Sequence, residues 1–374
     1  MARLSSGYGG RDSLLRLLAH FFRIDPPLLL ALLLLCATGL VALYSASGQD
    51  LDTVLRQGLR MAVAFGAMLL LAQVPSRSLR LWAPWVYAGG VALLIVVLVA
   101  GDVGKGAQRW LDLGVLRFQP SEILKIGLPL AMAWYLSERP LPPRLGRILV
   151  AVVVTAVPCV LIAYQPDLGT ALLVCCSGLF ALFLSGMHWR LLLGFVAIAA
   201  ASTPVLWHFM HDYQRRRVLT FLNPESDPLG SGYHIIQSKI AIGSGGTYGK
   251  GWLNGTQSNL DFLPERSTDF VFAVYGEEFG FIGAVLLLLL YVFVVLRGLM
   301  FAVGAQDSFE RILAGSLSLT FFFYLFVNIG MVTGLLPVVG VPLPLMSYGG
   351  TSMVTLMAGF GILMAINSHR RLLA

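Results

Sequence analysis

Long apolar stretches alternate with short polar connections along almost the whole chain. A helix that spans a membrane needs about 20 mainly apolar residues. Stretches of about that length recur roughly ten times, at residues 27–46, 57–74, 81–101, 121–137, 147–164, 170–187, 191–210, 270–297, 309–334 and 350–367. The pattern predicts an all-α polytopic integral membrane protein with about ten transmembrane helices.

Composition and charge sharpen this prediction. Of the 374 residues, 57% are hydrophobic and 12% are charged, whereas an average soluble domain has roughly 25% charged residues. If the N-terminus is cytoplasmic, the inside segments hold 14 of the 26 Lys and Arg residues and the short outside loops hold four. Basic residues favour cytoplasmic loops, so both termini are expected to be cytoplasmic. The net charge of +7 is scattered singly between the spans, which argues against nucleic acid as a partner.

The polar segment 211–268 is the longest interruption, and it separates the seventh expected span from the eighth. On this topology it is a large extracytoplasmic loop. We expect one membrane domain over residues 1–374, divided into a cytoplasmic N-terminal segment (1–26), helices 1–7 (27–210), the large loop (211–268), helices 8–10 (269–367) and a cytoplasmic tail (368–374).

A second interruption is the apolar segment 335–349, which carries Pro337, Gly340, Pro342 and Pro344. These residues exclude an ordinary spanning helix. Broken backbone survives at membrane depth only where protein or a water-filled cavity satisfies its polar groups. We therefore expect a short re-entrant or interfacial loop that walls a cavity.

Ionisable residues within membrane spans are costly and are candidates for function. Here they are Arg60, Glu122, Lys125, Glu277 and Glu278. Glu122 and Lys125 share one helix face just after Pro120, either as a self-paired helix end or as a pair that lines a polar cavity. Glu277 and Glu278 either end a helix in water at the membrane edge or have a functional role.

Asp269 stands where the polar loop becomes a membrane helix. Aspartate is a favoured N-cap residue, so capping is one interpretation. The other is a general base for a membrane-anchored substrate, because such a base must lie at the boundary between water and lipid.

The glycine-rich stretch 243–251 is either a tightly turned loop or an anion-binding nest supplied with charge by nearby basic residues. It departs from a nucleotide phosphate loop at Ser244 and Gly251. The four cysteines lie in apolar runs without metal-ligand spacing. They are expected to be small hydrophobic residues.

Several long motifs extend through the chain. They are KGAQRWLDLG at 105–114, FQPSE at 118–122, QPDLGT at 165–170, GYHIIQSKIAIGSGG at 232–246, FLPERSTDF at 262–270 and NIGMVTGLLPVVGVPLPLMSYGG at 328–350. On these motifs the chain resembles the SEDS family (shape, elongation, division and sporulation), most closely its rod-shape branch. The resemblance covers nearly everything from about residue 25 to the end.

The resemblance implies a peptidoglycan glycosyltransferase that polymerises lipid II into β-1,4 glycan strands during cell elongation, on the outer face of the bacterial cytoplasmic membrane. Asp269 matches the family's essential aspartate, which acts as general base in an inverting reaction. Glu122 and Lys125 match a polar pair in the family's central cavity. Ser267 departs from the pattern, since many relatives have His there, and a histidine-assisted proton transfer is therefore not expected.

Undecaprenyl pyrophosphate would be the leaving group in that reaction. Arg109, Arg217 and Lys239 are the candidates for stabilising its charge, with or without a divalent cation such as Mg²⁺ or Mn²⁺. The expected partners are a class B penicillin-binding transpeptidase of the elongation type, other elongation-complex proteins and membrane lipids. Two alternatives stay open: a flippase for the lipid-linked precursor, and the division-type branch with the same reaction.

Overall fold

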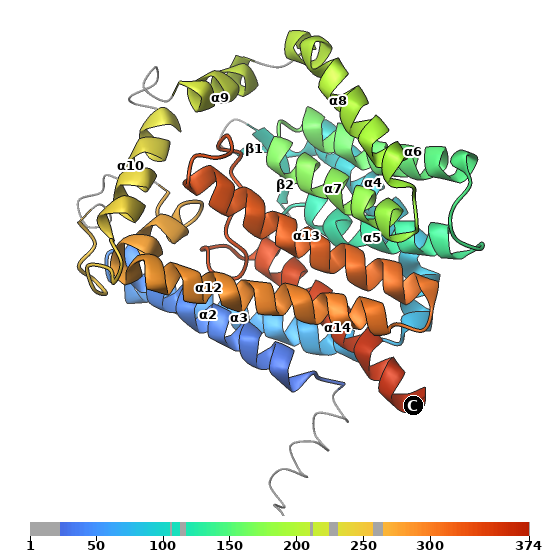
Figure 1. Cartoon of the computed structure of the whole chain (residues 1–374), viewed down its shortest axis with the longest axis horizontal. Coiled ribbons are helices and arrows are strands. Elements are labelled where there is room, and N and C mark those ends of the chain that lie inside the picture. Colours follow the sequence, from blue (N-terminus) through green and yellow to red (C-terminus); the bar gives the residue numbers. More distant parts are fainter. Residues whose placement is uncertain are drawn as a thin grey trace, which may run out of the picture.

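The computed structural model describes residues 23–104, 107–112, 117–209, 212–223, 231–256 and 265–373. Each predicted span contains a helix (Figure 1), namely α2 (Pro26–Ala46), α3 (Leu51–Ala72), α4 (Ser76–Ala100), α5 (Ser121–Ser137), α6 (Leu145–Tyr164), α7 (Leu168–Leu184), α8 (Trp189–Phe209), α12 (Val271–Gly304), α13 (Ser308–Val332) and α14 (Thr351–Leu373). Within the described ranges, seven helices are long and apolar enough to cross a membrane. The predicted all-α, multi-pass membrane fold is confirmed.

Asp25 shows how one end of this bundle is built. It is the N-cap of α2, where its side chain accepts a hydrogen bond from Leu28 N at 3.2 Å. The same carboxylate lies 2.8 Å from Arg297 Nη2 of α12 and 3.4 Å from Asn367 Nδ2 of α14. The start of α2 and the C-terminal part of α14 therefore lie at the same end of the bundle.

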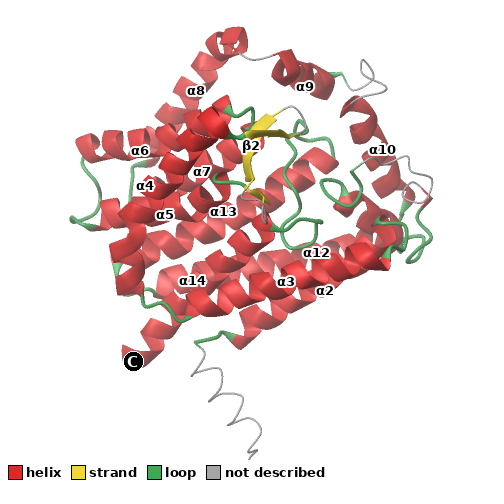
Figure 2. Ribbon diagram, turned by 180° about the vertical axis from the view of Figure 1, so that it is seen from behind, coloured by secondary structure: helices red, strands yellow, loops and turns green. Residues whose placement is uncertain are grey.

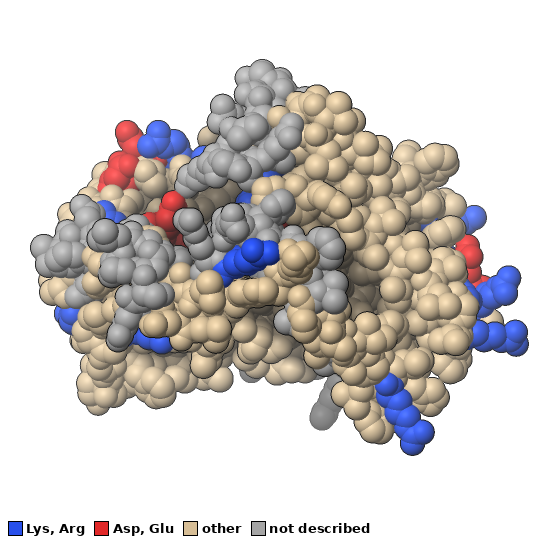
Figure 3. All heavy atoms as spheres, turned by 90° about the horizontal axis from the view of Figure 1, so that it is seen from above, with Lys and Arg blue, Asp and Glu red and all other residues tan. Residues whose placement is uncertain are grey.

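The outer surface suits a lipid environment. Charged side chains gather toward two opposite ends of the molecule, and the broad surface between them is mainly uncharged (Figure 3). Leu55, Leu70 and Trp85 on this outer surface expose about 70% or more of their side chains. Exposed apolar area of this kind is unfavourable in water but not in a bilayer.

The long polar segment is partly helical, with α9 (Asp212–Leu222) and α10 (Ser231–Ser244) in it. Together with α8 these helices form an arc around one side of the molecule (Figure 1). Between α4 and α5 lie three short antiparallel strands in the order β1-β2-β3, visible in Figure 2: β1 (Asp102–Gly104), β2 (Ala107–Asp112) and β3 (Arg117–Phe118). The sequence pattern did not predict these strands.

α12 is broken at Gly280, which has φ 67° and ψ −165°. A Cβ atom on Gly280 would lie 2.2 Å from Gly249 N, so only glycine fits this contact. Around the break, Lys250 N and Gly251 N donate to the carbonyls of Glu277 and Glu278, each at 3.0 Å. The glycine-rich stretch is therefore a tightly turned loop packed on α12, and these two N–H groups are not available for an anion.

Candidate active site

Asp269 lies in the turn that precedes α12. The N-cap position of α12 is Phe270 and not Asp269, so the interpretation of Asp269 as the N-cap residue is wrong. The main-chain oxygen of Asp269 accepts a hydrogen bond from Asn328 Nδ2 of α13 at 3.0 Å. Its half-buried carboxylate lies beside the loop between α13 and α14, since a Cβ on Gly340 would be 3.6 Å from Asp269 Oδ2.

The Pro- and Gly-containing segment 335–349 is not helical and binds directly to this turn. Ser347 Oγ donates to Thr268 O at 2.5 Å, and Tyr348 N donates to Ser267 O at 2.8 Å. Asn328 Nδ2 also donates to Val341 O at 2.7 Å. Protein groups thus satisfy the broken backbone, as its position among membrane helices requires.

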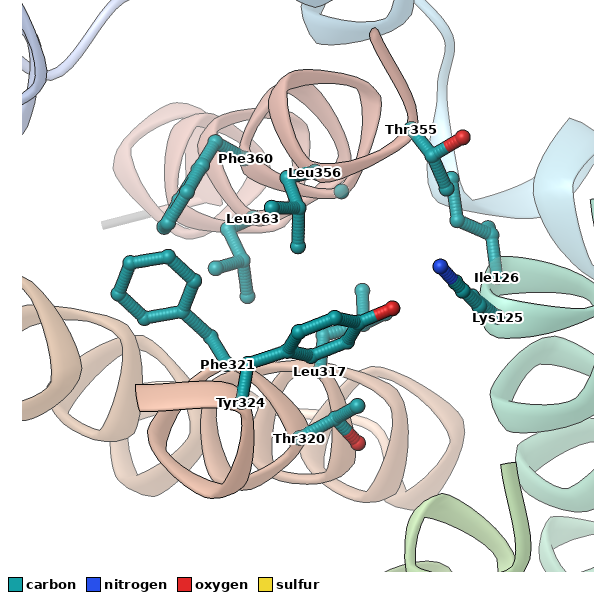
Figure 4. Close-up of a pocket in the computed structure, with 11 residues that line it drawn as sticks. Lys125, Ile126, Leu317, Thr320, Phe321, Tyr324, Thr355, Leu356, Phe360 and Leu363 are labelled. Atoms are coloured by element: carbon teal, nitrogen blue, oxygen red, sulfur yellow. The ribbon is translucent and has the colours of Figure 1, made fainter. Parts of the chain in front are cut away.

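Glu122 and Lys125 form a buried ion pair on α5, with 2.6 Å between Glu122 Oε1 and Lys125 Nζ. The Lys125 ammonium lies 5.1 Å from the ring centroid of Tyr324 on α13. Figure 4 shows Lys125 reaching from α5 toward Tyr324, with Thr355 of α14 on the opposite side. The cavity between these helices has a volume of about 30 Å³, enough for a water molecule.

The two earlier interpretations of this pair are therefore combined: the residues neutralise each other and also line a cavity. Glu122 keeps an unused acceptor, because its buried Oε2 has no hydrogen-bond partner in the described part of the chain. A buried carboxylate oxygen without a donor is unfavourable. It is suited to a substrate hydroxyl or to water.

α13 connects the ion pair to Asp269. Tyr324, which lies over Lys125, and Asn328, which holds the Asp269 main chain, are four residues apart on the same helix. Residues with this spacing lie on the same face, about 6 Å apart along the axis. The structure thus places the Glu122–Lys125 pair and the Asp269 turn against neighbouring turns of α13.

An apolar groove of about 490 Å³ extends from Glu122 between α3, α4, α5 and α14. Trp82, Val86, Ile126 and Val354 are among the residues that line it. A groove that is apolar along its length and carries a carboxylate suits a ligand with an apolar chain and a polar head.

The three predicted pyrophosphate-binding residues are placed differently. Arg109 donates to Gln165 O at 3.2 Å and to Pro166 O, and its Nη1 lies 3.8 Å from Asp167 Oδ2, so its guanidinium is engaged at the start of α7. Lys239 is exposed on α10, with the end of its side chain against Gly334. Arg217 belongs to α9, but its side chain lies outside the described residues.

Glu277 and Glu278 are completely buried, so their interpretation as a helix end in water is wrong. Glu277 Oε1 lies 2.6 Å from Lys250 Nζ and accepts from Thr256 N at 2.8 Å. Glu278 Oε1 accepts from Leu253 N at 3.2 Å and from the Ser45 hydroxyl of α2. These contacts fix the loop over residues 244–256 to α12 and α2.

Sequence reasoning missed Gln57 and Asn328 as parts of the site. Gln57 is buried on α3, donates to Ser347 O and accepts from Gly349 N, both at 3.3 Å. Each has an amide side chain inside an apolar span, where an unsatisfied amide would be costly. The position of these two amides inside apolar spans was the signal by which the sequence could have identified them.

Metal ligands do not gather in the described part of the chain. No three His, Cys, Asp or Glu side chains there are close enough together to hold a metal ion. The four cysteines are free and lie within or beside the apolar core, as expected. The side chains of these ranges therefore offer no cage of their own for a divalent cation.

Fold and site together define a multi-pass membrane protein in which a broken loop, a half-buried carboxylate and a buried ion pair converge on one helix. The chain belongs to the FTSW_RODA_SPOVE family of cell cycle proteins, whose model matches residues 26–372. It is 55% identical over 352 residues to the peptidoglycan glycosyltransferase MrdB of Escherichia coli K12, covering 94% of this chain and 95% of the relative. It is 36% identical over 363 residues to a probable peptidoglycan glycosyltransferase FtsW of Geobacter metallireducens, covering 93% and 96%.

Solved structures agree with this assignment. A chain of a peptidoglycan synthase complex that coordinates polymerization and crosslinking matches with a TM-score of 0.81 and 36% identity, over 92% of this chain and 98% of that one. The rod shape determining protein RodA of Thermus thermophilus matches with a TM-score of 0.71 and 31% identity, over 92% and 97%. The family resemblance noted from the motifs is confirmed.

Proposed function

We propose that this chain is a peptidoglycan glycosyltransferase of the elongation type, which polymerises lipid II into β-1,4 glycan strands. Its similarity to MrdB, at 55% identity over nearly the whole chain, supports the elongation type over the division type. The observation that carries the proposal is the Asp269 carboxylate, half-buried on a turn that Asn328 and the broken segment hold in place.

Asp269 is the general base of this reaction. It removes the proton from the acceptor sugar's 4-hydroxyl as that oxygen attacks the anomeric carbon of the donor sugar. The bond from the anomeric carbon to undecaprenyl pyrophosphate breaks on the opposite face, so the configuration inverts and no covalent enzyme intermediate forms. General base catalysis of this kind contributes about 10²- to 10⁴-fold in rate.

The surrounding charges bind the rest of the substrate. Glu122 Oε2 accepts a hydrogen bond from a substrate hydroxyl, and Lys125 holds the Glu122 side chain in place. Arg109, Arg217 and Lys239 remain the proposed cations for the departing pyrophosphate. A divalent cation, Mg²⁺ or Mn²⁺, would be carried by the pyrophosphate, since the described side chains form no cage for one.

The enzyme would lie in the bacterial cytoplasmic membrane with both termini in the cytoplasm and Asp269 facing the periplasm. The distribution of Lys and Arg between the connecting segments supports this orientation. Its proposed partner is a class B penicillin-binding transpeptidase. The similar chain in a synthase complex that coordinates polymerization with crosslinking supports such a partner.

The test is lipid II polymerisation by the full chain co-purified with its transpeptidase. Asp269→Asn should lower the rate at least about 10²-fold, because the amide cannot accept the proton. Asp52→Asn, an exposed aspartate in the first turn of α3, is the matched control and should keep the wild-type rate. Adding a chelator to a parallel reaction tests whether polymerisation requires a divalent cation.

Glycan strands made at the wild-type rate by Asp269→Asn would contradict the mechanism. Transport of lipid II across vesicle membranes by both variants, with no glycan from the wild type, would instead favour the flippase.

A further inference from the structure

Arg60 is a cation inside a membrane span. It lies nine residues after the start of α3 at Leu51, roughly two and a half helical turns, and its side chain is half-buried. Charged side chains at such depth usually pair with one another or mark a ligand path. Within the described ranges, however, the Arg60 guanidinium makes no ion pair and no hydrogen bond. Its one recorded partner there is the ring of Tyr348, with 4.5 Å from Cζ to the centroid.

Tyr348 links Arg60 to the turn that precedes α12 and carries Asp269. Tyr348 N donates to Ser267 O at 2.8 Å, and the neighbouring Ser347 Oγ donates to Thr268 O at 2.5 Å. Ser267 and Thr268 directly precede Asp269 in the chain. The residue that stacks on Arg60 is thus hydrogen-bonded two residues from the proposed general base.

α3 itself is fixed to the same loop. Gln57, one turn before Arg60 on the same helix face, donates to Ser347 O and accepts from Gly349 N, both at 3.3 Å. Since both hydrogen bonds bind one amide side chain to the loop backbone, α3 cannot slide along the loop without breaking them. The position of Arg60 relative to the Asp269 turn is therefore set by protein contacts.

A guanidinium stacked on an aromatic ring is held in an orientation that suits anion binding. The Tyr348 ring covers one face of Arg60, while the N–H groups point outward in the guanidinium plane, in the fork that matches phosphate oxygens. Lys239 also makes no ion pair within the described ranges, but it is exposed to water, so an unpaired charge there costs little. Arg109 is already engaged with Gln165, Pro166 and Asp167. Arg60 is the described cation whose environment calls for an anionic ligand.

We propose that Arg60, stacked on Tyr348, binds the pyrophosphate of the lipid-linked substrate beside Asp269. This inference rests on the proposed glycosyltransferase function for the identity of the ligand. The same chemistry could be met by the phosphate of a bilayer phospholipid, so the test compares the two sources.

The first measurement is binding without turnover. The full chain in detergent is titrated with farnesyl pyrophosphate, with farnesol as the uncharged control and phosphatidylglycerol as the phospholipid, and thermal stabilisation is recorded. Arg60→Gln should bind farnesyl pyrophosphate about 10- to 100-fold more weakly than the wild type, because charge-assisted hydrogen bonds are lost. Arg60→Lys should lie between the two, since it keeps the charge but not the planar fork.

Arg56→Gln is the matched control. Arg56 is exposed on the same helix, and its replacement should leave both affinity and polymerisation unchanged. In the polymerisation assay, Arg60→Gln should lower kcat/KM for lipid II by about 10- to 100-fold. The melting temperature without ligand shows that each variant is folded, and Arg60→Lys supplies the result if Arg60→Gln is not.

Three outcomes would overturn the proposal: wild-type affinity for farnesyl pyrophosphate in Arg60→Gln, equal loss in Arg56→Gln, or stabilisation by phosphatidylglycerol that matches farnesyl pyrophosphate and depends on Arg60. A wild type that binds farnesyl pyrophosphate through Arg60 but makes no glycan would refute the proposed function and leave the pyrophosphate site standing.

Discussion

Lys250→Met removes the cation that faces Glu277 near the start of α12. Glu277 Oε1 lies 2.6 Å from Lys250 Nζ, and the exposed fractions of the two side chains are 0% and 27%. After the substitution, Glu277 keeps the hydrogen bonds from Thr256 N at 2.8 Å and Thr256 Oγ1 at 3.0 Å. A buried carboxylate would then remain without its ammonium partner.

Removing one partner of a buried ion pair costs about 3–5 kcal/mol, because the other charge stays buried and uncompensated. The two Thr256 donors still bind Glu277, so we expect the lower end, about 3 kcal/mol, for Lys250→Met. Glu277→Gln keeps an acceptor for Thr256, and it leaves a lysine that is partly exposed and can reach water. We expect this variant to lose about 1–2 kcal/mol.

The assay is a double-mutant cycle on the free energy of unfolding in detergent. We expect a coupling energy of about 1–3 kcal/mol between the two positions. Lys239→Met, an exposed lysine on α10, is the control and should change stability by less than about 0.5 kcal/mol. Additive effects, or a larger loss for Glu277→Gln than for Lys250→Met, would refute the assignment of a buried pair with unequal exposure.

Two further substitutions test the packing of α12. Gly280→Ala should lower the melting temperature strongly, because φ is 67° and the new Cβ would lie 2.2 Å from Gly249 N; Gly66→Ala, with nothing within 4 Å, should instead stabilise by about 0.5–1 kcal/mol. Equal melting temperatures would contradict the close contact. Asp25→Ala should cost about 2–4 kcal/mol in unfolding free energy, because it removes a helix cap and both hydrogen bonds from Arg297. A loss below about 1 kcal/mol would mean that Asp25 does not tie the helices together.

Much of the fold could be predicted because a membrane span is marked in the sequence by consecutive residues. A span is recognised from about 20 consecutive apolar residues, whatever they later contact. The non-helical segment 335–349 was equally readable, since proline and glycine break helices wherever they occur. For the same reason Glu122 and Lys125 stood out: charges three residues apart in an apolar helix share a face in any tertiary arrangement.

The environment of each candidate could not be predicted in this way. Glu277 and Glu278 were open to two interpretations until the loop over residues 244–256 was seen to fold back and bury them. Capping by Asp269 was plausible from its position, but α12 begins at Val271 and Phe270 occupies the cap. Arg109 could not be known to bind the segment around Asp167, which lies more than 50 residues later.

The sequence by itself thus determined the multi-pass membrane class and, through its motifs, the family, and it singled out Asp269 as the candidate general base. Only the tertiary structure decided what holds the turn before α12: Asn328 of α13 binds the main chain of Asp269, Ser347 and Tyr348 bind the two preceding residues, and Arg60 of α3 stacks on Tyr348. The physical reason is the separation along the chain of the residues that produce each feature. Apolar length and helix breakage are properties of neighbouring residues, whereas a hydrogen bond or a stacked cation depends on which distant helices pack together.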